Sequence, residues 1–342
     1  MSGVIGWDVG GVHLKAARAE NGHIVDAIAI ASPLRTGLEP LEKAFAEATA
    51  RMGVARRHVV TMTGELADTF SSHAEGVERL SRLAARKLVG APVLLYAGPA
   101  GFISPDDVRG HVADIASANW HASASLVARR QDAALFVDMG STTTDLVPVM
   151  GGSVAARGYA DGERLAVGEL VYTGLLRSFL MAVADRAPFA GNWTPLINEN
   201  FANMADVHRI FGTLADGIDL LATADGRDKT ADSSRARLAR IVGRDASEAD
   251  EATWTALARW FAEAQIRSVA DAAMLVLSRE GFPAGAPIVG AGIGETVLRE
   301  VARRLHRDYI AFDTMLDVAP SVRAAAAQCA PAAALAILGS NL

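Results

Sequence analysis

Two short segments of the chain combine an aspartate, glycines and small hydroxyl residues in a pattern suited to phosphate chemistry. Residues 7–16 read W-D-V-G-G-V-H-L-K-A and residues 137–146 read V-D-M-G-S-T-T-T-D-L, at a constant offset of 130 positions. In each copy an apolar run ends in aspartate, a turn follows, and a second apolar run begins. Such a turn can direct several backbone N–H groups at one anion, and the aspartate can hold Mg²⁺ through water.

This repeat assigns a role to most of its polar residues. Asp8 and Asp138 are the expected metal ligands, and Lys15 is expected to contact a phosphate oxygen as a point charge. Asp145, which aligns with Lys15, is either a residue that orients the metal's ligands or a base. The remaining donors to a diphosphate are Gly10, Gly11, Gly140, Ser141, Thr142 and Thr143. A plain hairpin turn is the alternative for either copy alone, and Lys15 could simply extend from a strand edge.

The elements that must position these segments alternate between strands and helices. In the first half the pattern predicts strands at residues 3–9, 12–19, 22–31, 58–63 and 92–97, and helices at 33–52, 75–89 and 115–130. In the second half it predicts strands at 133–137, 145–149, 287–290 and 309–312, and helices at 168–184, 204–222, 248–280, 294–305 and 321–338. Residues 188–203 are expected to be irregular, and residues 224–245 to form a loop and a short basic helix.

Together these elements predict an α/β protein of two related halves that close on one phosphate-bearing ligand. The expected subdomains are residues 1–132 and 133–342. The second is expected to carry a basic insertion near residues 185–245 and a C-terminal helix that packs back on the first.

Composition excludes several classes of protein. The 342 residues are 51% hydrophobic and 21% charged with a net charge of −6, which excludes extensive disorder and argues against nucleic-acid binding. The single cysteine, Cys329, excludes a disulfide framework and a Cys-rich metal site. The charge-free, alanine-rich stretch at 324–342 predicts a buried helix rather than a membrane span, and the N-terminus lacks a signal-peptide pattern. We therefore expect a cytoplasmic protein without membrane partners. A homodimer is compatible with this sequence.

The two segments resemble the phosphate loops of the actin-like ATPase superfold, which includes sugar kinases, Hsp70 chaperones and actin. Residues 290–295, G-A-G-I-G-E, are similar to the adenosine-side glycine motif of that superfold. The resemblance implies two α/β subdomains around a cleft, with Gly290, Gly292 and Gly294 at a nucleotide-like pocket. A tightly packed strand-to-helix turn is the alternative for these glycines.

A closer resemblance covers nearly the whole chain. Six segments of the chain resemble the methanofuran-biosynthesis branch of the hydantoinase/oxoprolinase-like proteins, which is linked to tetrahydromethanopterin-dependent one-carbon metabolism. The six segments are residues 6–11, 61–68, 118–122, 138–145, 168–174 and 223–229. The resemblance implies transfer of an aminomethylfuran-methyl group from its diphosphate to the phenol oxygen of a glutamyl-tyramine or tyrosine-like acceptor. Pyrophosphate would leave, Mg²⁺ would be the cofactor, and ATP would not be required. The implied partners are small-molecule diphosphate and phenol substrates.

Such a reaction needs a base for the phenol, whose pKa is near 10 in its free form. Glu65 is the first candidate and Asp68 the second, because spacing of three residues puts both on one face of an expected helix start. Charges that complement a helix N-terminus are the alternative reading.

Further residues within or beside these runs could line the acceptor and furan pockets. They are Asn119 and His121 on a predicted helix, and Arg164, Glu169 and Tyr172 before or at the start of another. Glu169 could pair with the aminomethyl cation. Arg227 and Lys229 belong to a basic stretch that could meet the diphosphate or a glutamyl carboxylate, although a solvated basic helix would show the same pattern.

Two other functions fit the same superfold. One is an ATP-dependent small-molecule kinase or ATPase, and the other is a nucleotide-binding regulatory or assembly protein. Dependence on nucleotide separates these three hypotheses, because only the ether-forming transferase would work without ATP.

Overall fold

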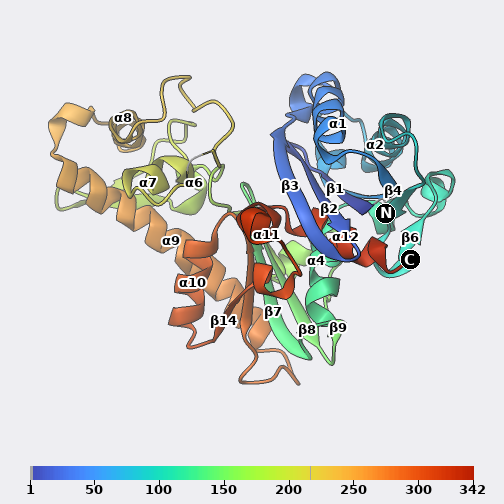
Figure 1. Cartoon of the computed structure of the whole chain (residues 1–342). Helices are drawn as coiled ribbons and strands as arrows, with labels where there is room; N and C mark the ends of the chain where they lie inside the picture. Colours follow the sequence, from blue (N-terminus) through green and yellow to red (C-terminus); the bar gives the residue numbers. More distant parts are fainter. Residues whose placement is uncertain (1–2, 216) are drawn as a thin grey trace. The chain divides into compact units, whose positions relative to one another are not determined.

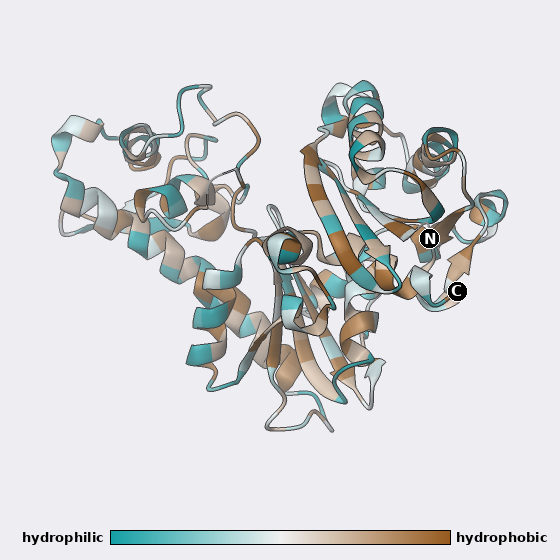
Figure 2. Cartoon of the chain, in the orientation of Figure 1, coloured by the Kyte–Doolittle hydropathy of each residue, from teal (hydrophilic) through white to brown (hydrophobic). Residues whose placement is uncertain are grey.

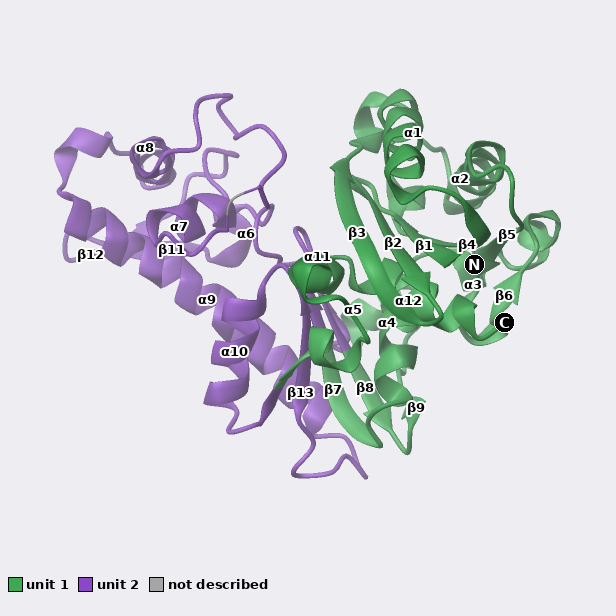
Figure 3. Cartoon of the chain, viewed as in Figure 1, with its two compact units in different colours: residues 1–136, 147–167, 310–342 green, residues 137–146, 168–309 purple. Residues whose placement is uncertain are grey.

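The computed structural model describes residues 3–215 and 217–342, which form two compact units (Figure 3). Unit 1 comprises Met1–Phe136, Val147–Val167 and Ile310–Leu342, and unit 2 comprises Val137–Leu146 and Gly168–Tyr309. The division therefore differs from a single boundary near residue 132, because two later stretches of the chain belong to the first unit.

The first sheet lies wholly within unit 1. Its strand order is β3-β2-β1-β4-β5-β6, with antiparallel pairing among β1, β2 and β3 and parallel pairing of β1, β4 and β5. All seven residues of β1 are buried, as expected of a strand covered on both faces. The strands are β1 (Gly3–Val9), β2 (His13–Glu20), β3 (His23–Ala31), β4 (Ala55–Met62), β5 (Val93–Tyr96) and β6 (Phe102–Ile103).

Helices pack on both faces of this sheet (Figure 1). On one face α1 (Glu39–Met52) and α2 (His73–Lys87) bury the core around Trp7 and Phe45. On the other face α12 (Ala330–Ser340) lies directly against β1, where a Cβ atom at Gly6 would be only 2.0 Å from the Ala332 carbonyl oxygen. The alanine-rich composition of α12 and the glycine in β1 are therefore explained by close helix–sheet packing.

The remaining elements of unit 1 are short. They are α3 (Val112–Ile115), α4 (Asn119–Ala128), β9 (Ser153–Val154), α5 (Asp161–Ala166) and α11 (Arg323–Gln328). Within the described residues no single helix has both the length and the apolar character needed to cross a membrane. The pair Pro320–Gln328 and Ala330–Ser340 passes on length and composition together, but its halves are bent by 111°.

The second sheet repeats the strand order of the first. Its order is β10-β8-β7-β13-β14, so each strand has a counterpart in β3-β2-β1-β4-β5, and β9 pairs with β8 outside this path. Figure 2 shows β3 largely in hydrophobic colours and much of α10 (Glu295–Arg304) in hydrophilic ones. The strands are β7 (Ala133–Met139), β8 (Thr144–Met150), β10 (Leu170–Val171), β13 (Ile288–Gly292) and β14 (Tyr309–Ala311). The predicted duplication is thus visible in the topology.

Unit 2 also carries a helical insertion with its own core. The core packs Trp254, Leu257 and Phe261 of the 27-residue helix α9 against α7 and α8. The insertion contains α6 (Leu180–Val183), β11 (Arg186–Phe189), β12 (Asn192–Pro195), α7 (Met204–Ile210) and α8 (Ala231–Ile241), and is followed by α9 (Glu251–Leu277).

Three predictions about this part of the chain are wrong. The expected helix at 168–184 is instead the short strand β10 and a turn before α6, because residues 170–171 complete the second sheet by pairing with β8. The expected helix at 204–222 ends with α7 at Ile210. The stretch 188–203, expected to be irregular, contains the β11–β12 hairpin, which turns on positive φ angles at Ala190 and Gly191.

Candidate functional site

The hairpin between β1 and β2 places Asp8 and Lys15 directly opposite each other in unit 1. The two residues are register partners, with 3.8 Å between Lys15 Nζ and Asp8 Oδ2. The Asp8 side chain is buried, whereas the Lys15 side chain keeps 27% of its surface exposed. The Gly10 N–H donates to the His13 carbonyl (3.0 Å) and closes the turn. Asp8 therefore already has a cation beside it in this structure.

The hairpin between β7 and β8 repeats this closure in unit 2. The Gly140 N–H donates to the Thr143 carbonyl at 2.9 Å, and the hydroxyl oxygens of Ser141 and Thr142 are 3.4 Å apart. Asp138 stands at the end of β7 and is half-buried. A Cβ atom at Gly292 would lie 2.3 Å from Asp138 Oδ1, so that glycine permits the chain to pass beside the carboxylate.

In both hairpins the carbonyl groups are held from behind by a later segment of the same unit. In unit 1 the N–H of Leu34 donates to the Gly11 carbonyl (2.9 Å) and that of Ser32 donates to the Val12 carbonyl (2.8 Å). In unit 2 the carbonyls of Gly140 and Ser141 accept hydrogen bonds of 2.8–3.1 Å from the N–H groups of residues 175, 176 and 177.

This arrangement leaves N–H groups of both turns available. Within the described part of the chain, the N–H groups of Gly11, Val12, Ser141 and Thr142 have no hydrogen-bond acceptor. A turn whose carbonyls are tied back and whose N–H groups remain open is the arrangement that binds an anion. The geometry of each hairpin therefore fits the phosphate-binding role predicted for it.

A buried polar chain supports the second hairpin. The Thr144 hydroxyl donates to the Thr173 carbonyl (2.6 Å), and Gln265 Nε2 donates to Thr173 Oγ1 (2.9 Å) and to the Gly174 carbonyl (2.8 Å). His208 Nε2 lies 3.3 Å from Gln265 Oε1. A Cβ atom at Gly174 would be 2.5 Å from the Thr142 nitrogen, so only glycine fits there. Sequence reasoning missed Gln265 and His208, because nothing in the sequence pairs α7 and α9 with this turn.

The candidate metal ligands suit an ion that takes few protein ligands. Among the described residues no group of three or more His, Cys, Asp or Glu side chains could hold a metal ion. A Mg²⁺ ion at Asp138 would therefore draw most of its oxygen ligands from water and substrate phosphates, as Mg²⁺ commonly does.

Glu65 lies beside the first hairpin in unit 1, but not on a helix. Residues 64–66 form a single 3₁₀ turn, in which Glu65 is 1% exposed, while Asp68 is exposed in the following turn. The prediction that both carboxylates share one face of a helix start is wrong, because the chain turns again after Leu66. A Cβ atom at Gly64 would lie 3.1 Å from the Val9 carbonyl oxygen, which places the Glu65 turn against the hairpin.

The Glu65 carboxyl is anchored on one side only. Its Oε1 accepts a hydrogen bond from the Ser117 hydroxyl (2.9 Å), and its Oε2 is buried without a hydrogen-bond partner among the described residues. Burial raises the pKa of this carboxyl, an effect that hydrogen bonds from the backbone and from Ser117 partly offset. A raised pKa brings a carboxylate closer to the value that suits a general base near neutral pH.

The same burial predicts an unusual effect of substitution on stability. A carboxyl whose pKa is higher in the folded than in the unfolded chain contributes stability at acid pH that is lost as the pH rises. We therefore expect Glu65→Gln to unfold at the same temperature as the unaltered protein near pH 4 and at a higher temperature near pH 8. Thermal unfolding monitored by circular dichroism across this range measures the difference. The exposed Glu47→Gln should show no such divergence, and a Glu65→Gln curve parallel to wild type would contradict the burial argument.

Three of the residues predicted to bind substrate gather in unit 1. Arg164 is buried, with its guanidinium carbon 4.1 Å from the centre of the Trp120 ring. His121 Nδ1 lies 2.8 Å from the Tyr96 hydroxyl, and burial and the charge of Arg164 lower the pKa of His121 to about 4. The imidazole is therefore neutral at physiological pH. The Asn119 Oδ1 accepts a hydrogen bond from the Trp120 N–H (2.7 Å), at the start of α4.

The other predicted substrate residues lie in unit 2 with different surroundings. Glu169 is fully buried and pairs with Arg279 at 2.5 Å, so its charge is already balanced; a role in binding the aminomethyl cation is not supported. The Tyr172 side chain is exposed at the end of β10. Asp145 pairs with Leu170 in the ladder between β8 and β10. Arg227 is 65% exposed, and Lys229 Nζ donates to the Asp219 carbonyl (2.5 Å).

The glycines of the predicted nucleotide-like pocket are packed against their own chain. A Cβ atom at Gly290 would lie 2.2 Å from the Tyr309 hydroxyl, and one at Gly294 would lie 2.2 Å from Met139 Sδ. A Cβ atom at Gly292 would lie 2.3 Å from the Met139 carbonyl oxygen. The alternative of a tightly packed strand-to-helix turn therefore accounts for all three glycines.

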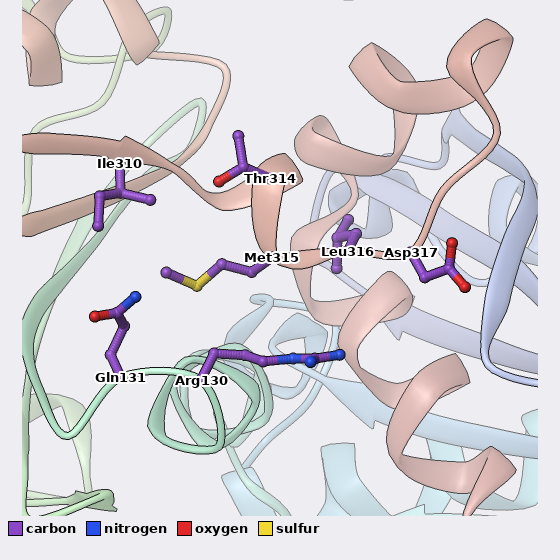
Figure 4. A pocket seen from close by; sticks show the side chains of 7 residues that line it. All are labelled: Arg130, Gln131, Ile310, Thr314, Met315, Leu316 and Asp317. Atoms are coloured by element: carbon purple, nitrogen blue, oxygen red, sulfur yellow. The ribbon is translucent and has the colours of Figure 1, made fainter.

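One hollow in unit 1 contains none of the predicted residues. It has a volume of about 360 Å³ and lies beside the segment after β14, with Met315 pointing into it and Asp317 at its edge (Figure 4). Asp317 Oδ1 lies 2.7 Å from His23 Nδ1. The lining residues are Arg130, Gln131, Ile310, Thr314, Met315, Leu316 and Asp317.

Two sheets of equal strand order, each opening with an Asp-Gly hairpin, define the actin-like ATPase fold predicted from the sequence. The hydantoinase/oxoprolinase family matches residues 56–330, and the chain belongs to this family. Among solved structures, nucleotide-free acetone carboxylase superposes with a TM-score of 0.60 over 97% of this chain and 70% of that one, at 10% identity.

Two curated relatives share one name. It describes a synthase whose product is a furan bearing a methanamine and a phenoxymethyl group, with a γ-L-glutamylaminoethyl chain on the phenoxy ring. The relative from Methanocaldococcus jannaschii is 34% identical over 54% of this chain and 56% of its own length. The relative from Methanococcus vannielii is 29% identical over 50% of this chain and 75% of its own length. The alignment with the first relative thus spans just over half of each chain.

Proposed function

We propose that this protein is a transferase of methanofuran-type cofactor biosynthesis that joins a furan to a phenol through an aryl ether. The substrates are an aminomethylfuran-methyl diphosphate and a glutamyl-tyramine or tyrosine-like acceptor. The proposal depends mainly on the two curated relatives, because the product described in their shared name contains this phenoxymethyl-furan linkage. The location of a buried carboxyl beside the first hairpin adds independent support from the structure.

The proposed reaction balances without a nucleotide. The bond between the furan CH₂ carbon and the diphosphate oxygen breaks, and a bond between that carbon and the phenol oxygen forms. The phenol proton moves to the Glu65 carboxylate, while pyrophosphate leaves with the bonding electrons. Each hairpin by itself carries groups that can stabilise negative charge on a phosphate: the N–H groups of Gly11 and Val12 and the Lys15 cation in unit 1, and the N–H groups of Ser141 and Thr142 in unit 2. Mg²⁺ bound at Asp138 would supply further charge stabilisation.

The proposal is tested by incubating the purified full chain with Mg²⁺, the aminomethylfuran-methyl diphosphate and either γ-glutamyltyramine or tyramine, in the absence of ATP. We expect one pyrophosphate for each ether formed, detected by enzyme-coupled phosphate assay and mass spectrometry. Stoichiometric conversion of ATP to ADP with product formation would overturn the transferase proposal in favour of a kinase.

The segment containing Arg227 and Lys229 is expected to contribute to substrate binding rather than to the chemical step. Asp225 anchors this segment through Arg237 at 3.0 Å, while Arg227 extends into solvent. Replacing both Arg227 and Lys229 with alanine should raise KM for one substrate by about fivefold and leave kcat unchanged, the size expected for exposed charges. Steady-state kinetics with each substrate varied in turn measures this, with Arg244→Ala from the same basic stretch as control. Unchanged KM values for both substrates would remove this role.

A further inference from the structure

Ser117 has a backbone conformation that its side chain does not favour. It connects α3 to α4 with a φ of +52°, in the left-handed region that is costly for a residue other than glycine, asparagine or aspartate. Its neighbours Ile115, Ala118 and Trp120 are buried, so the surrounding core fixes the chain at this position. A non-glycine residue held in this region by its surroundings is a common feature of functional sites.

The conformation directs the Ser117 hydroxyl to Glu65. Ser117 Oγ donates to Glu65 Oε1 at 2.9 Å, across 52 positions of sequence, and both residues are buried. Glu65 is confined on its other side by α2, where a Cβ atom at Gly76 would lie 2.7 Å from the Glu65 Cα atom. The carboxyl group thus has one anchored oxygen, and its other oxygen is enclosed without a hydrogen-bond partner among the described residues.

We propose that Ser117 is a positioning residue, whose hydroxyl holds Glu65 Oε1 and so orients Glu65 Oε2, which has no hydrogen-bond partner among the described residues, to accept the proton of the acceptor phenol. The role of Oε2 rests on the proposed function, whereas the coupling between Ser117 and Glu65 does not. The arrangement follows the general logic of a base oriented by a third group. In the sequence, Ser117 directly precedes the family-like run at 118–122, but no residue pattern there indicates its contact with Glu65.

The charged groups on the neighbouring helices determine how much the ionised form of Glu65 depends on the hydrogen bond from Ser117. Asp161, at the start of α5, acts on the Glu65 carboxyl as a like charge. On the same helix Arg164 is stacked over Trp120. On α2, Glu75 is turned to Ser71 and Arg79, with hydrogen bonds of 2.8 and 3.0 Å. Ser117 is therefore the side chain that stabilises the ionised form of Glu65 by a hydrogen bond, against burial and the repulsion from Asp161.

The test uses Ser117→Ala and Ser117→Gly in the full-length protein. Both variants remove the hydroxyl, but alanine keeps the unfavourable φ and glycine relieves it, so their effects on stability should differ. The first readout is the titration of the Glu65 carboxyl by ¹³C NMR without substrate, with its resonance identified by its loss in Glu65→Gln. The second readout is the pH dependence of kcat/KM for pyrophosphate release.

We expect both variants to raise the midpoint of the Glu65 titration by about one pH unit, because each loses a hydrogen bond to the ionised form. The acid limb of the kcat/KM profile should move by the same amount, which is a tenfold loss of rate at a pH below both midpoints. Ser123→Ala removes a buried serine hydroxyl of α4 and should leave both readouts unchanged.

An unmoved Glu65 midpoint in both variants would overturn the proposal, whatever their stability. A shifted midpoint together with an unmoved acid limb would overturn the part of the proposal that makes Oε2 the proton acceptor. If the unaltered protein releases no pyrophosphate from the diphosphate and phenol pair, the proposed function fails, and the NMR titration still decides the coupling between Ser117 and Glu65.

Discussion

Asp138→Asn should reduce the rate of pyrophosphate release by at least about a hundredfold. Asparagine keeps the size of the side chain and its place beside Gly292, but it removes the negative charge proposed to hold Mg²⁺. Loss of one group that stabilises developing charge in an enclosed site commonly costs a factor of about 100 to 1,000 in kcat. The measurement is the release rate at saturating concentrations of both substrates, repeated over a series of Mg²⁺ concentrations.

The matched control is Asp132→Asn, immediately before the opposite end of the same strand, where the aspartate is exposed. This variant should retain full activity and the same dependence on Mg²⁺. An Asp138→Asn protein with wild-type kcat and wild-type Mg²⁺ dependence would remove Asp138 from the metal site. A loss of activity in both variants would point to a general effect of substitution around β7 rather than to the metal.

Arg237→Ala should lower the free energy of unfolding by about 3–5 kcal/mol. The Arg237 side chain is 0% exposed, with hydrogen bonds from its Nε to Asp206 Oδ1 (2.8 Å) and from its Nη1 to Asp225 Oδ1 (3.0 Å). Asp206 is itself buried, so removing the guanidinium leaves a carboxylate in a low-dielectric environment with less compensation. Denaturant unfolding followed by tryptophan fluorescence measures the loss, because Trp254 belongs to the same core.

Arg267→Ala provides the comparison with an exposed ion pair. Arg267 is 72% exposed and pairs with Asp271 at 2.6 Å one turn along α9. An exposed pair of this kind contributes little, and its loss should change the free energy of unfolding by no more than about 0.5 kcal/mol. Equal stability of the two variants would show that the Asp206–Arg237–Asp225 cluster does not hold the insertion together.

The repeated Asp-Gly segments were sufficient to predict the architecture around each hairpin. The strands predicted at 3–9, 133–137 and 145–149 follow from apolar runs, and the structure places β1 at 3–9, β7 at 133–139 and β8 at 144–150. The equal offset of the two copies then predicts that the halves share one topology, and the two sheets do have the same strand order. These features could be predicted because they depend on the local order of apolar, glycine and acidic residues.

The environment of Glu65 shows where sequence reasoning stops. Spacing of three residues placed Glu65 and Asp68 together, yet one is buried and the other is exposed. What separates them is the packing of Gly64 on the first hairpin and of Gly76 on Glu65, contacts that join distant parts of the chain. The Ser117 hydrogen bond belongs to the same class of contact, because it depends on a left-handed backbone angle that no local pattern encodes.

The stretch 168–184 shows the same limit for secondary structure. Its apolar and small residues suit a helix by propensity, but residues 170–171 pair with β8, and the N–H groups of residues 175, 176 and 177 bind the carbonyls of the second hairpin. Tertiary partners that satisfy backbone hydrogen bonds override a weak local preference. The positive φ of Gly168 and the close approach of Gly174 to Thr142 are consequences of that pairing.

By itself, the sequence determined the duplicated plan, the strands that end in aspartate and the residues of both hairpins, since each depends on neighbours within about ten positions. Only the tertiary structure decided which carboxylate is buried, that Arg279 pairs with Glu169, that Gln265 supports the second hairpin and that Ser117 contacts the candidate base. These outcomes depend on which side chains from distant segments share one interior. There, burial and hydrogen bonds shift the pKa of a carboxyl group more strongly than its position in the chain does.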